Sequence, residues 1–143
     1  MTYDPTYDPG NIFAKILRGD IPCHKVHEDT DVLVFMDVMP QSTGHTLVVP
    51  KAASRNVLDA DPKVLANIMP LVQKVAIAAK AAFSADGITI WQFNEPAGGQ
   101  TVFHLHYHVI PRFDGVALKA HSGKMEDDAV LSANAAKLKA AMV

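Results

Sequence analysis

One short stretch of the chain carries the pattern that decides the fold, Phe103-His104-Leu105-His106-Tyr107-His108-Val109-Ile110. Side chains along a β-strand point alternately to its two faces, with a rise of roughly 3.3 Å per residue. The spacing therefore predicts a strand that carries three imidazoles on one face. Leu105, Tyr107 and Val109 would then point to the other face.

The three imidazoles indicate a functional site rather than part of the core. Imidazole ionises near neutrality and can act as a nucleophile, an acid, a base or a metal ligand. Aligned histidines lose hydration and repel one another when charged, with no gain in packing over Val or Ile. A single strand histidine is more often structural, but the strict alternation of His104, His106 and His108 favours chemistry.

Length and composition bound the class of protein. The 143 residues fit one domain, and 49% hydrophobic with 20% charged residues is ordinary for a soluble globular chain. The formal charge of −2 gives no broad basic surface, so nucleic acid is not an expected partner. Small phosphorylated ligands are compatible with this charge.

Cysteine usage and hydropathy give the expected location. The single cysteine, Cys23, cannot form an internal disulfide, which favours a reducing, cytoplasmic location. No stretch is expected to reach the run of about 18 apolar residues that crosses a bilayer, and the acidic N-terminal region is unlike a signal peptide. We therefore expect no association with a membrane.

The chain divides into an arm and one domain. Residues 1–10 contain a tandem repeat, Thr2-Tyr3-Asp4-Pro5 and Thr6-Tyr7-Asp8-Pro9, and are predicted to form a flexible arm because Asp-Pro pairs favour turns. Residues 11–143 are predicted to form a single domain with an Ala-rich helical tail from about residue 126.

Apolar periodicity predicts the elements of this domain. A short amphipathic helix is expected at about residues 12–17, and a long one at 62–83, which Pro70 should kink. Strands are expected at 24–28, 32–37, 46–49 and 88–93 and in the histidine stretch. The last two should pair antiparallel, because the loop between them is too short for a crossover. This order predicts an α+β domain with a five-stranded, mostly antiparallel sheet.

Polar residues in three other segments are candidates for the same site. His45 precedes a strand and is either a turn residue or an imidazole that orients a triad histidine. Asp37 ends a strand and is either a turn cap or a carboxylate that accepts from two vicinal hydroxyls, as in ribose binding. The polar, Gly-containing segment 94–101 is either a plain hairpin turn or a loop whose amides suit phosphate.

Together these segments resemble the histidine triad (HIT) family of nucleotide hydrolases and transferases, and in particular its bacterial Hint-like members. The family signature is His-φ-His-φ-His-φ-φ, where φ is apolar, and residues 104–110 match it. The likeness spans most of residues 11–115. It implies a homodimer, which the sequence also favours, because strand 88–94 and the long helix carry more apolar surface than one small sheet can cover.

The resemblance implies a role for each site residue. His106 would attack the α-phosphorus of a purine nucleotide and become transiently nucleotidylated. His104 and His108 would bind phosphoryl oxygens and tune His106. His45 would lie behind them, and Thr101 would donate to the leaving group. The positions implied to bind substrate are Asn94 and Gln100 for phosphate, Asp37 for ribose, and Ile12, Phe13, Ile16, Ile21, Phe35 and Val38 for the base.

The implied activity is hydrolysis of nucleotide phosphoramidates or dinucleoside polyphosphates. His108 stands where related uridylyltransferases carry glutamine, which points to water as the final acceptor. Thr101 replaces a frequent serine and keeps a hydroxyl. Some bacterial members bind a structural zinc, but this chain has Asn11, Ala14 and Ala53 at the ligand positions. We therefore expect no bound metal and no cofactor.

Two other classes are compatible with the pattern. His-x-His motifs on strands bind metals in cupins, although residues 109–115 lack the glutamate that such a site needs. A nucleotide-binding regulatory or interaction protein would keep the base slot and show little turnover. Turnover rather than binding separates this second alternative from an enzyme.

Overall fold

The sheet at the centre of the molecule has five antiparallel strands in the order β1-β2-β3-β5-β4. The computed structural model describes residues 6–121 and 123–142. Its elements are α1 (Ile12–Leu17), β1 (Lys25–Glu28), β2 (Val32–Met36), β3 (Thr46–Pro50), η1 (Val57–Asp59), α2 (Pro62–Ala82), β4 (Gly87–Trp91), η2 (Pro96–Gly98), β5 (Tyr107–Arg112) and α3 (Asp128–Ala141). The α+β class, the two early helices and the helical tail are as predicted.

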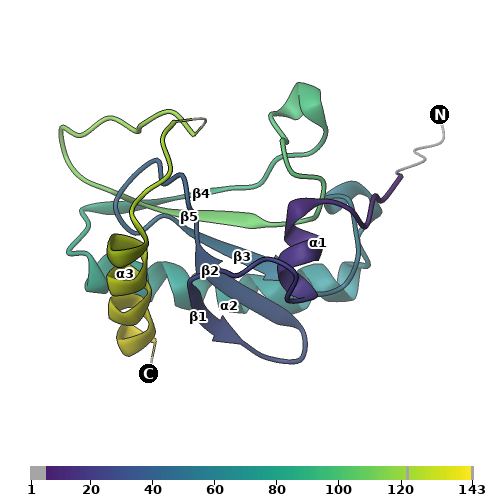
Figure 1. Cartoon of the computed structure of the whole chain (residues 1–143), viewed down its shortest axis with the longest axis horizontal. Helices are drawn as coiled ribbons and strands as arrows, with labels where there is room; N and C mark the ends of the chain where they lie inside the picture. The colour runs from purple at the N-terminus through teal and green to yellow at the C-terminus, as the bar shows by residue number, and fades with distance from the viewer. Residues whose placement is uncertain (1–5, 122, 143) are drawn as a thin grey trace.

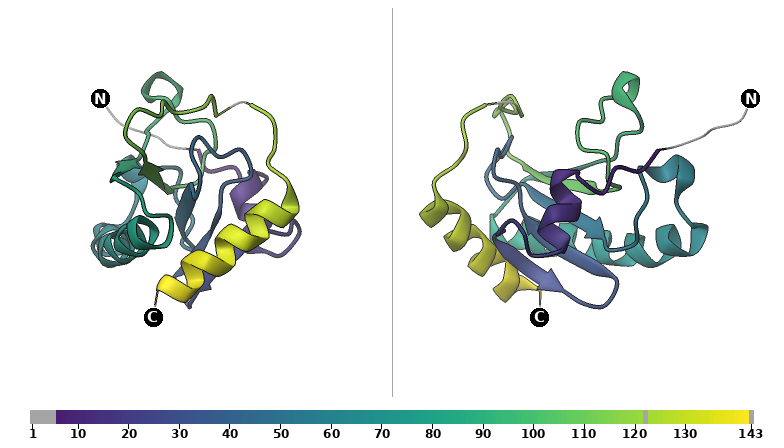
Figure 2. Two further views of the ribbon diagram at one scale, coloured as in Figure 1. Left: turned by 90° about the vertical axis from the view of Figure 1, so that its left-hand side faces the viewer. Right: turned by 45° about the vertical axis from the view of Figure 1, so that its right-hand side comes forward.

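Both faces of the sheet are buried at its three central strands, β2, β3 and β5, which are mostly apolar, whereas the edge strands β1 and β4 are partly exposed. Val32, Val34 and Met36 of β2 join the core formed with α2 and α3. Leu33 and Phe35 of β2 join a second, smaller core with Phe13 of α1. Accordingly, α1 and α2 lie on opposite sides of the sheet (Figure 1, Figure 2). The larger core lies on the face covered by α2 and α3, and the face that carries α1 has only the smaller core.

Helix α2 is long because its start is capped and one of its faces is continuously apolar. The Asp61 carboxylate accepts from the Lys63 amide at 2.8 Å, with Pro62 at the first helical position. The helix runs through Pro70 to Ala82. By length and composition it could cross a membrane, with a mean hydropathy of 1.3, so the expectation that no stretch is apolar enough was wrong. Core helices pass the same test, and the buried stripe of α2 packs on the sheet.

The histidine stretch is a strand over only part of the predicted length. β5 begins at Tyr107 and continues to Arg112, so that His104 and His106 precede it and His108 lies within it. Before the strand, the Leu105 amide donates to the carbonyl of Ser54 at 2.9 Å instead of entering a ladder with a neighbouring strand. The predicted alternation nevertheless holds, because Leu105, Tyr107 and Val109 all lie in the core under α2.

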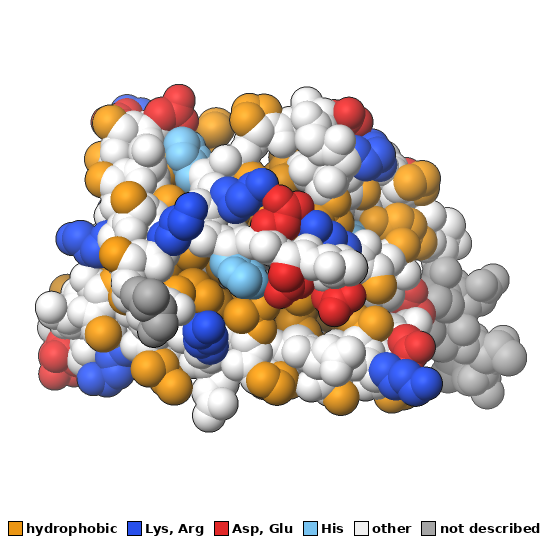
Figure 3. Space-filling model, turned by 90° about the horizontal axis from the view of Figure 1, so that it is seen from below, with side chains coloured by type: hydrophobic (Ala, Val, Ile, Leu, Met, Phe, Trp, Pro, Cys, Tyr) orange, Lys and Arg blue, Asp and Glu red, His pale blue; other side chains and the backbone are white. Residues whose placement is uncertain are grey.

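Charges of both signs are mixed on the surface. The face drawn in Figure 3 carries Lys and Arg side chains interspersed with Asp and Glu and with apolar side chains. It offers no continuous basic field for a polyanion. The site therefore has to be sought in a cavity rather than on this face.

Candidate active site

A cavity of about 690 Å³ opens beside α1, on the face of the sheet opposite α2. This volume lies within the range of small-molecule sites. The reactive or polar residues that line it are Cys23, His24, Asp37, Thr101, His106, His108, His121, Asp128 and Ser132. Every residue proposed for the base slot also lines it: Ile12, Phe13, Ile16, Ile21, Phe35 and Val38.

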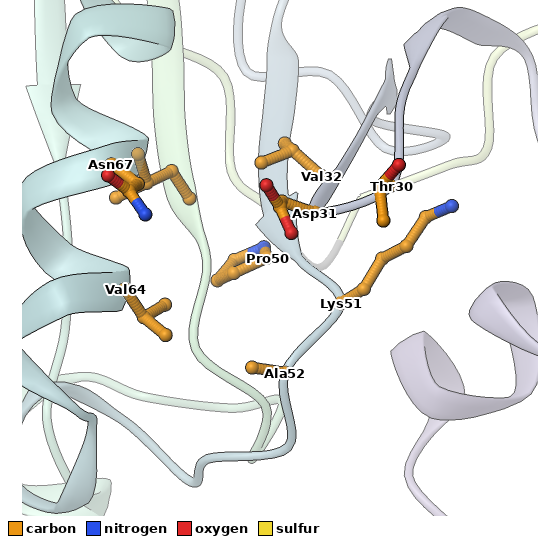
Figure 4. A pocket seen from close by; sticks show the side chains of 9 residues that line it. Thr30, Asp31, Val32, Pro50, Lys51, Ala52, Val64 and Asn67 are labelled. Atoms are coloured by element: carbon orange, nitrogen blue, oxygen red, sulfur yellow. The ribbon is translucent and has the colours of Figure 1, made fainter.

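A second, smaller cavity lies between α2 and the adjoining ends of β2 and β3. Its volume is about 100 Å³, which is too small for a nucleotide. Figure 4 shows Val64 and Asn67 of α2 on one side of it, while the Lys51 side chain extends away from the helix. The cavity beside α1 is the candidate site, because His106 and His108 of the triad line it.

His106 presents an unprotonated nitrogen to the larger cavity. Its Nδ1 lies 2.6 Å from the carbonyl oxygen of His104, and a carbonyl can only accept, so Nδ1 carries the hydrogen. Nε2 of the neutral ring then carries a free lone pair. Burial lowers the pKa of His106 to about 4, which keeps the ring neutral at physiological pH. The edge-on contact with Phe13, 4.7 Å between ring centroids, fixes its orientation.

His45 and His108 form a hydrogen-bonded pair whose tautomers follow from one backbone amide. The Gln41 N–H donates to Nδ1 of His45 at 3.1 Å, so the neutral His45 carries its hydrogen on Nε2. That nitrogen donates to Nδ1 of His108 at 2.9 Å. His108 therefore holds its own hydrogen on Nε2 and acts as a donor. Burial lowers the pKa of His45 to about 4 and that of His108 to about 3.

A glycine sets the entry of His45 into β3. Gly44 has a φ of +85°, in the left-handed region, and a Cβ there would lie 2.5 Å from the Phe83 ring. Only glycine meets both demands. His45 itself is fully buried and does not line the cavity, which it reaches only through its hydrogen bond to His108.

His104 is held away from the cavity. Its Nε2 donates to the Pro50 carbonyl at 2.7 Å, and its Nδ1 accepts from the Tyr7 hydroxyl at 2.7 Å. With both ring nitrogens engaged and the ring absent from the cavity lining, His104 cannot bind phosphoryl oxygens as predicted in this conformation. Its contribution here is the carbonyl group that orients His106.

The predicted N-terminal arm meets the domain at this point. Arg55 donates to the carbonyl of Thr6 at 3.2 Å, and Arg18 donates to that of Pro9 at 2.7 Å. Tyr7, between them, supplies the hydroxyl on His104. The first half of the arm, residues 1–5, lies outside the described residues.

Asp37 lies at the cavity wall with both carboxylate oxygens engaged. Oδ1 accepts from the Met39 amide at 2.9 Å, and Oδ2 accepts from Nε2 of His121 at 2.7 Å. Burial alone would raise the pKa of Asp37, but the hydrogen bond from His121 and the charges of His45 and His121 outweigh it and lower that pKa. The same hydrogen bond raises the pKa of His121. His121 escaped the sequence analysis because it stands alone in a polar loop, with no spacing relative to the triad.

Two predicted phosphate ligands lie outside the cavity lining. The amide of Gln100 is buried and bonds the carbonyls of Arg55 and Val102 and the amide of Asn56. The side-chain Oδ1 of Asn94 accepts from the backbone amide of Val57 at 2.9 Å. Both side chains therefore brace the loop before the triad in this structure. Thr101, the next residue, does line the cavity.

Ligand atoms of Asp37, His45 and His108 lie within 4.8 Å of one another, which makes this cluster a candidate metal site within the described residues. A metal on Nε2 of His45 would need the ring hydrogen to move to Nδ1, where it would face the donating amide of Gln41. The donor set therefore suits a chain of hydrogen bonds better than a metal ion.

Known proteins resemble this chain in sequence and in structure. The family model described as the HIT domain matches residues 18–115. An uncharacterised HIT-like protein of Borreliella burgdorferi is 42% identical over 112 residues, 76% of this chain and 81% of its own length. The adenosine 5'-monophosphoramidase hnt1 of Schizosaccharomyces pombe is 39% identical over 101 residues, 71% of this chain and 73% of its own.

A solved structure agrees over nearly the whole length. The HIT-like protein of Bartonella henselae superposes with a TM-score of 0.89 and 53% identity, and it covers 95% of this chain and 99% of its own. The five-stranded sheet and the cavity beside the triad are therefore set in a known architecture. On the family match, these relatives and this fold, the chain belongs to the HIT domain family.

Proposed function

We propose that this protein is a nucleotide hydrolase that forms a covalent intermediate on His106. The observation that carries the proposal is the neutral His106 ring, whose Nδ1 is fixed on a carbonyl and whose Nε2 is free at a cavity with an apolar slot. The proposed substrates are purine nucleotide phosphoramidates or dinucleoside polyphosphates. No bound metal or cofactor is required by this route.

The reaction takes two displacements at phosphorus. Nε2 of His106 attacks the α-phosphorus, a nitrogen–phosphorus bond forms, and the bond to the leaving group breaks. The ring becomes cationic, and the His104 carbonyl at 2.6 Å stabilises that charge. Water then attacks the same phosphorus, which releases the nucleoside monophosphate and restores the neutral ring.

Other cavity residues would stabilise the charge that develops on oxygen. The Nε2–H of His108, fixed by the hydrogen bond from His45, is a donor for a phosphoryl oxygen. The hydroxyl of Thr101 is a candidate donor to the leaving group. Asp37 would accept from the ribose hydroxyls, and the apolar slot would hold the base with weak discrimination between adenine and guanine.

The names of two relatives support the proposal that the substrate contains a nucleotide. One is named an adenosine 5'-monophosphoramidase, and another, from Arabidopsis thaliana, is named adenylylsulfatase HINT3. Both names describe an adenylyl group bonded through phosphorus to a different leaving group. For this chain we propose transfer of the nucleotidyl group to water, by displacement at phosphorus, in a cytoplasmic setting.

The test is turnover of an adenosine phosphoramidate and of a dinucleoside polyphosphate by the wild type and by His106→Ala. We expect the substitution to lower kcat by several orders of magnitude, because it removes the nucleophile of a covalent route. His27→Ala, a histidine paired with Asp29 on the surface, is the control. A His106→Ala protein with most of the wild-type rate would contradict the proposal. Binding of AMP without turnover of either substrate would favour a regulatory nucleotide-binding protein.

A further inference from the structure

His121 is the one imidazole at the cavity that lies beyond the family match at 18–115. It belongs to the segment between β5 and α3, and this segment is fastened on both sides of it. The Lys119 amide donates to the Gln41 carbonyl at 2.8 Å, and the Glu126 amide donates to the Val38 carbonyl at 2.9 Å. These anchors hold His121 over the loop that follows Asp37, so its place at the cavity wall is built by the fold.

The His121 imidazole is hydrogen-bonded to a carboxylate oxygen of Asp37 that would otherwise be available to the hydroxyls of a sugar. Its Nε2 lies 2.7 Å from Oδ2 of Asp37, whose other oxygen already accepts from Met39. A vicinal diol donates two hydrogen bonds and is best received by both oxygens of one carboxylate. While His121 is in place, only part of that accepting capacity is available.

The other groups around His121 give it no competing anion. The His108 ring lies edge-on to the His121 ring, with 5.8 Å between their centroids. The centroid of the His45 ring also lies 5.8 Å from that of His121. Both are neutral, because burial lowers the pKa of each. Across the cavity, Asp128 is 3.3 Å from His24. Asp37 is therefore the group that holds His121.

We infer that His121 limits the selectivity of the cavity for ribose, because it occupies the Asp37 carboxylate until the hydroxyls of a ribonucleotide displace it. The inference rests on the proposed function, in which Asp37 accepts from the ribose hydroxyls. A ligand with two hydroxyls can replace the lost hydrogen bond, whereas a ligand without them cannot. Binding of a ribose at Asp37 therefore includes the free-energy cost of displacing His121, which the ribose hydroxyls offset in part. Ligands without these hydroxyls leave His121 in place and do not meet this cost.

The experiment compares AMP with 2',3'-dideoxy-AMP by calorimetric titration at pH 8. His121→Ala removes the imidazole that competes with ribose for Asp37, so AMP should bind about three- to tenfold more tightly. This factor lies at the low end for a charge-assisted hydrogen bond, because the imidazole is partly exposed. The affinity for the dideoxy analogue should change less than twofold. His121→Gln, which keeps a weaker donor, should lie between His121→Ala and the wild type.

His27→Ala is the matched control, since it removes a histidine that is paired with an aspartate outside the cavity and is exposed to a similar extent, 36% against 34% for His121. Asp37→Asn tests the role on which the inference rests and should weaken AMP more than its dideoxy analogue. Failure of AMP to bind the wild type would contradict the proposed function. If AMP binds and Asp37→Asn acts selectively, unchanged or weaker AMP binding by both His121 variants would overturn the inference alone.

Discussion

Single hydrogen bonds give chemically identical histidines different tasks. His106 donates from Nδ1 to a carbonyl and keeps a free Nε2, while His108 accepts at Nδ1 and keeps a hydrogen on Nε2. His104 has no free ring nitrogen, because the Tyr7 hydroxyl and the Pro50 carbonyl engage both. The proposed division into nucleophile, donor and support thus rests on which backbone or side-chain group meets each ring.

Tyr7→Phe should lower the free energy of unfolding by about 1–2 kcal/mol. The substitution leaves the buried Nδ1 of His104 without its donor, which costs more than the loss of an average exposed hydrogen bond. Urea unfolding of wild type and variant measures the difference. Tyr107→Phe, a matched change at a tyrosine of the core under α2, controls for removal of a hydroxyl. Equal stability of Tyr7→Phe and wild type would show that this hydrogen bond contributes nothing net.

The turns before the strands position the site as much as the strands do. Gly44 turns the chain so that His45 reaches His108, and the segment before β5 folds His106 back onto the carbonyl of His104. β5 then carries His108 on the face opposite the core residues Tyr107 and Val109. The site is consequently sensitive to backbone conformation at two loop ends.

Gly44→Ala should destabilise the protein by about 2–4 kcal/mol. The added Cβ meets the Phe83 ring at 2.5 Å, and the left-handed φ adds its own cost. Gly19→Ala is the control, because Gly19 has a φ of +82° with nothing within 4 Å of the added atom. Thermal or urea unfolding should show a clearly larger loss for Gly44→Ala. Equal losses would mean that Phe83 moves aside freely.

Across the whole molecule, burying neutral imidazoles couples stability to pH. The pKa values of His45, His106 and His108 fall to about 4, 4 and 3, whereas in the unfolded chain they are ordinary, near 6.5. The unfolded chain therefore takes up protons first as the pH falls. His121, whose pKa is raised, has the opposite sign and contributes stability below about 6.5 that is lost as the pH rises through its folded pKa.

The free energy of unfolding should therefore be largest above about pH 6.5 and fall by several kcal/mol toward pH 4. Each unit of pKa difference corresponds to about 1.4 kcal/mol, and the four lowered imidazoles, with His104 also lowered by burial, outweigh the one that is raised. Urea unfolding between pH 5 and pH 8 measures the slope. His106→Ala should flatten it, because one of these four groups is gone. A stability independent of pH over this range would contradict the assignment of neutral, buried rings.

We also expect a homodimer, because apolar side chains remain exposed on α2 and on the edge strand β4. Met69 and Ile77 of α2 are 45% and 67% exposed, and Ile90 of β4 is 43% exposed. Large apolar side chains left exposed on these two elements favour an interface, and a symmetric pairing is the commonest solution. Light scattering at micromolar concentration should give twice the chain mass, and Ile90→Lys should shift it toward the monomer. A wild-type monomer would contradict this prediction.

The sequence by itself determined the class of fold and the face of the histidines, because apolar periodicity and the alternation of His104, His106 and His108 are local properties. The six apolar residues that the family resemblance implies for the base all line the cavity, and their role in binding a base stays a prediction. Only the tertiary structure decided that His104 points away from the cavity, that Gln100 and Asn94 brace a loop, and that Tyr7 and His121 reach the site. These contacts join residues 84 or 97 positions apart, and no local pattern encodes which buried acceptor a distant donor will meet.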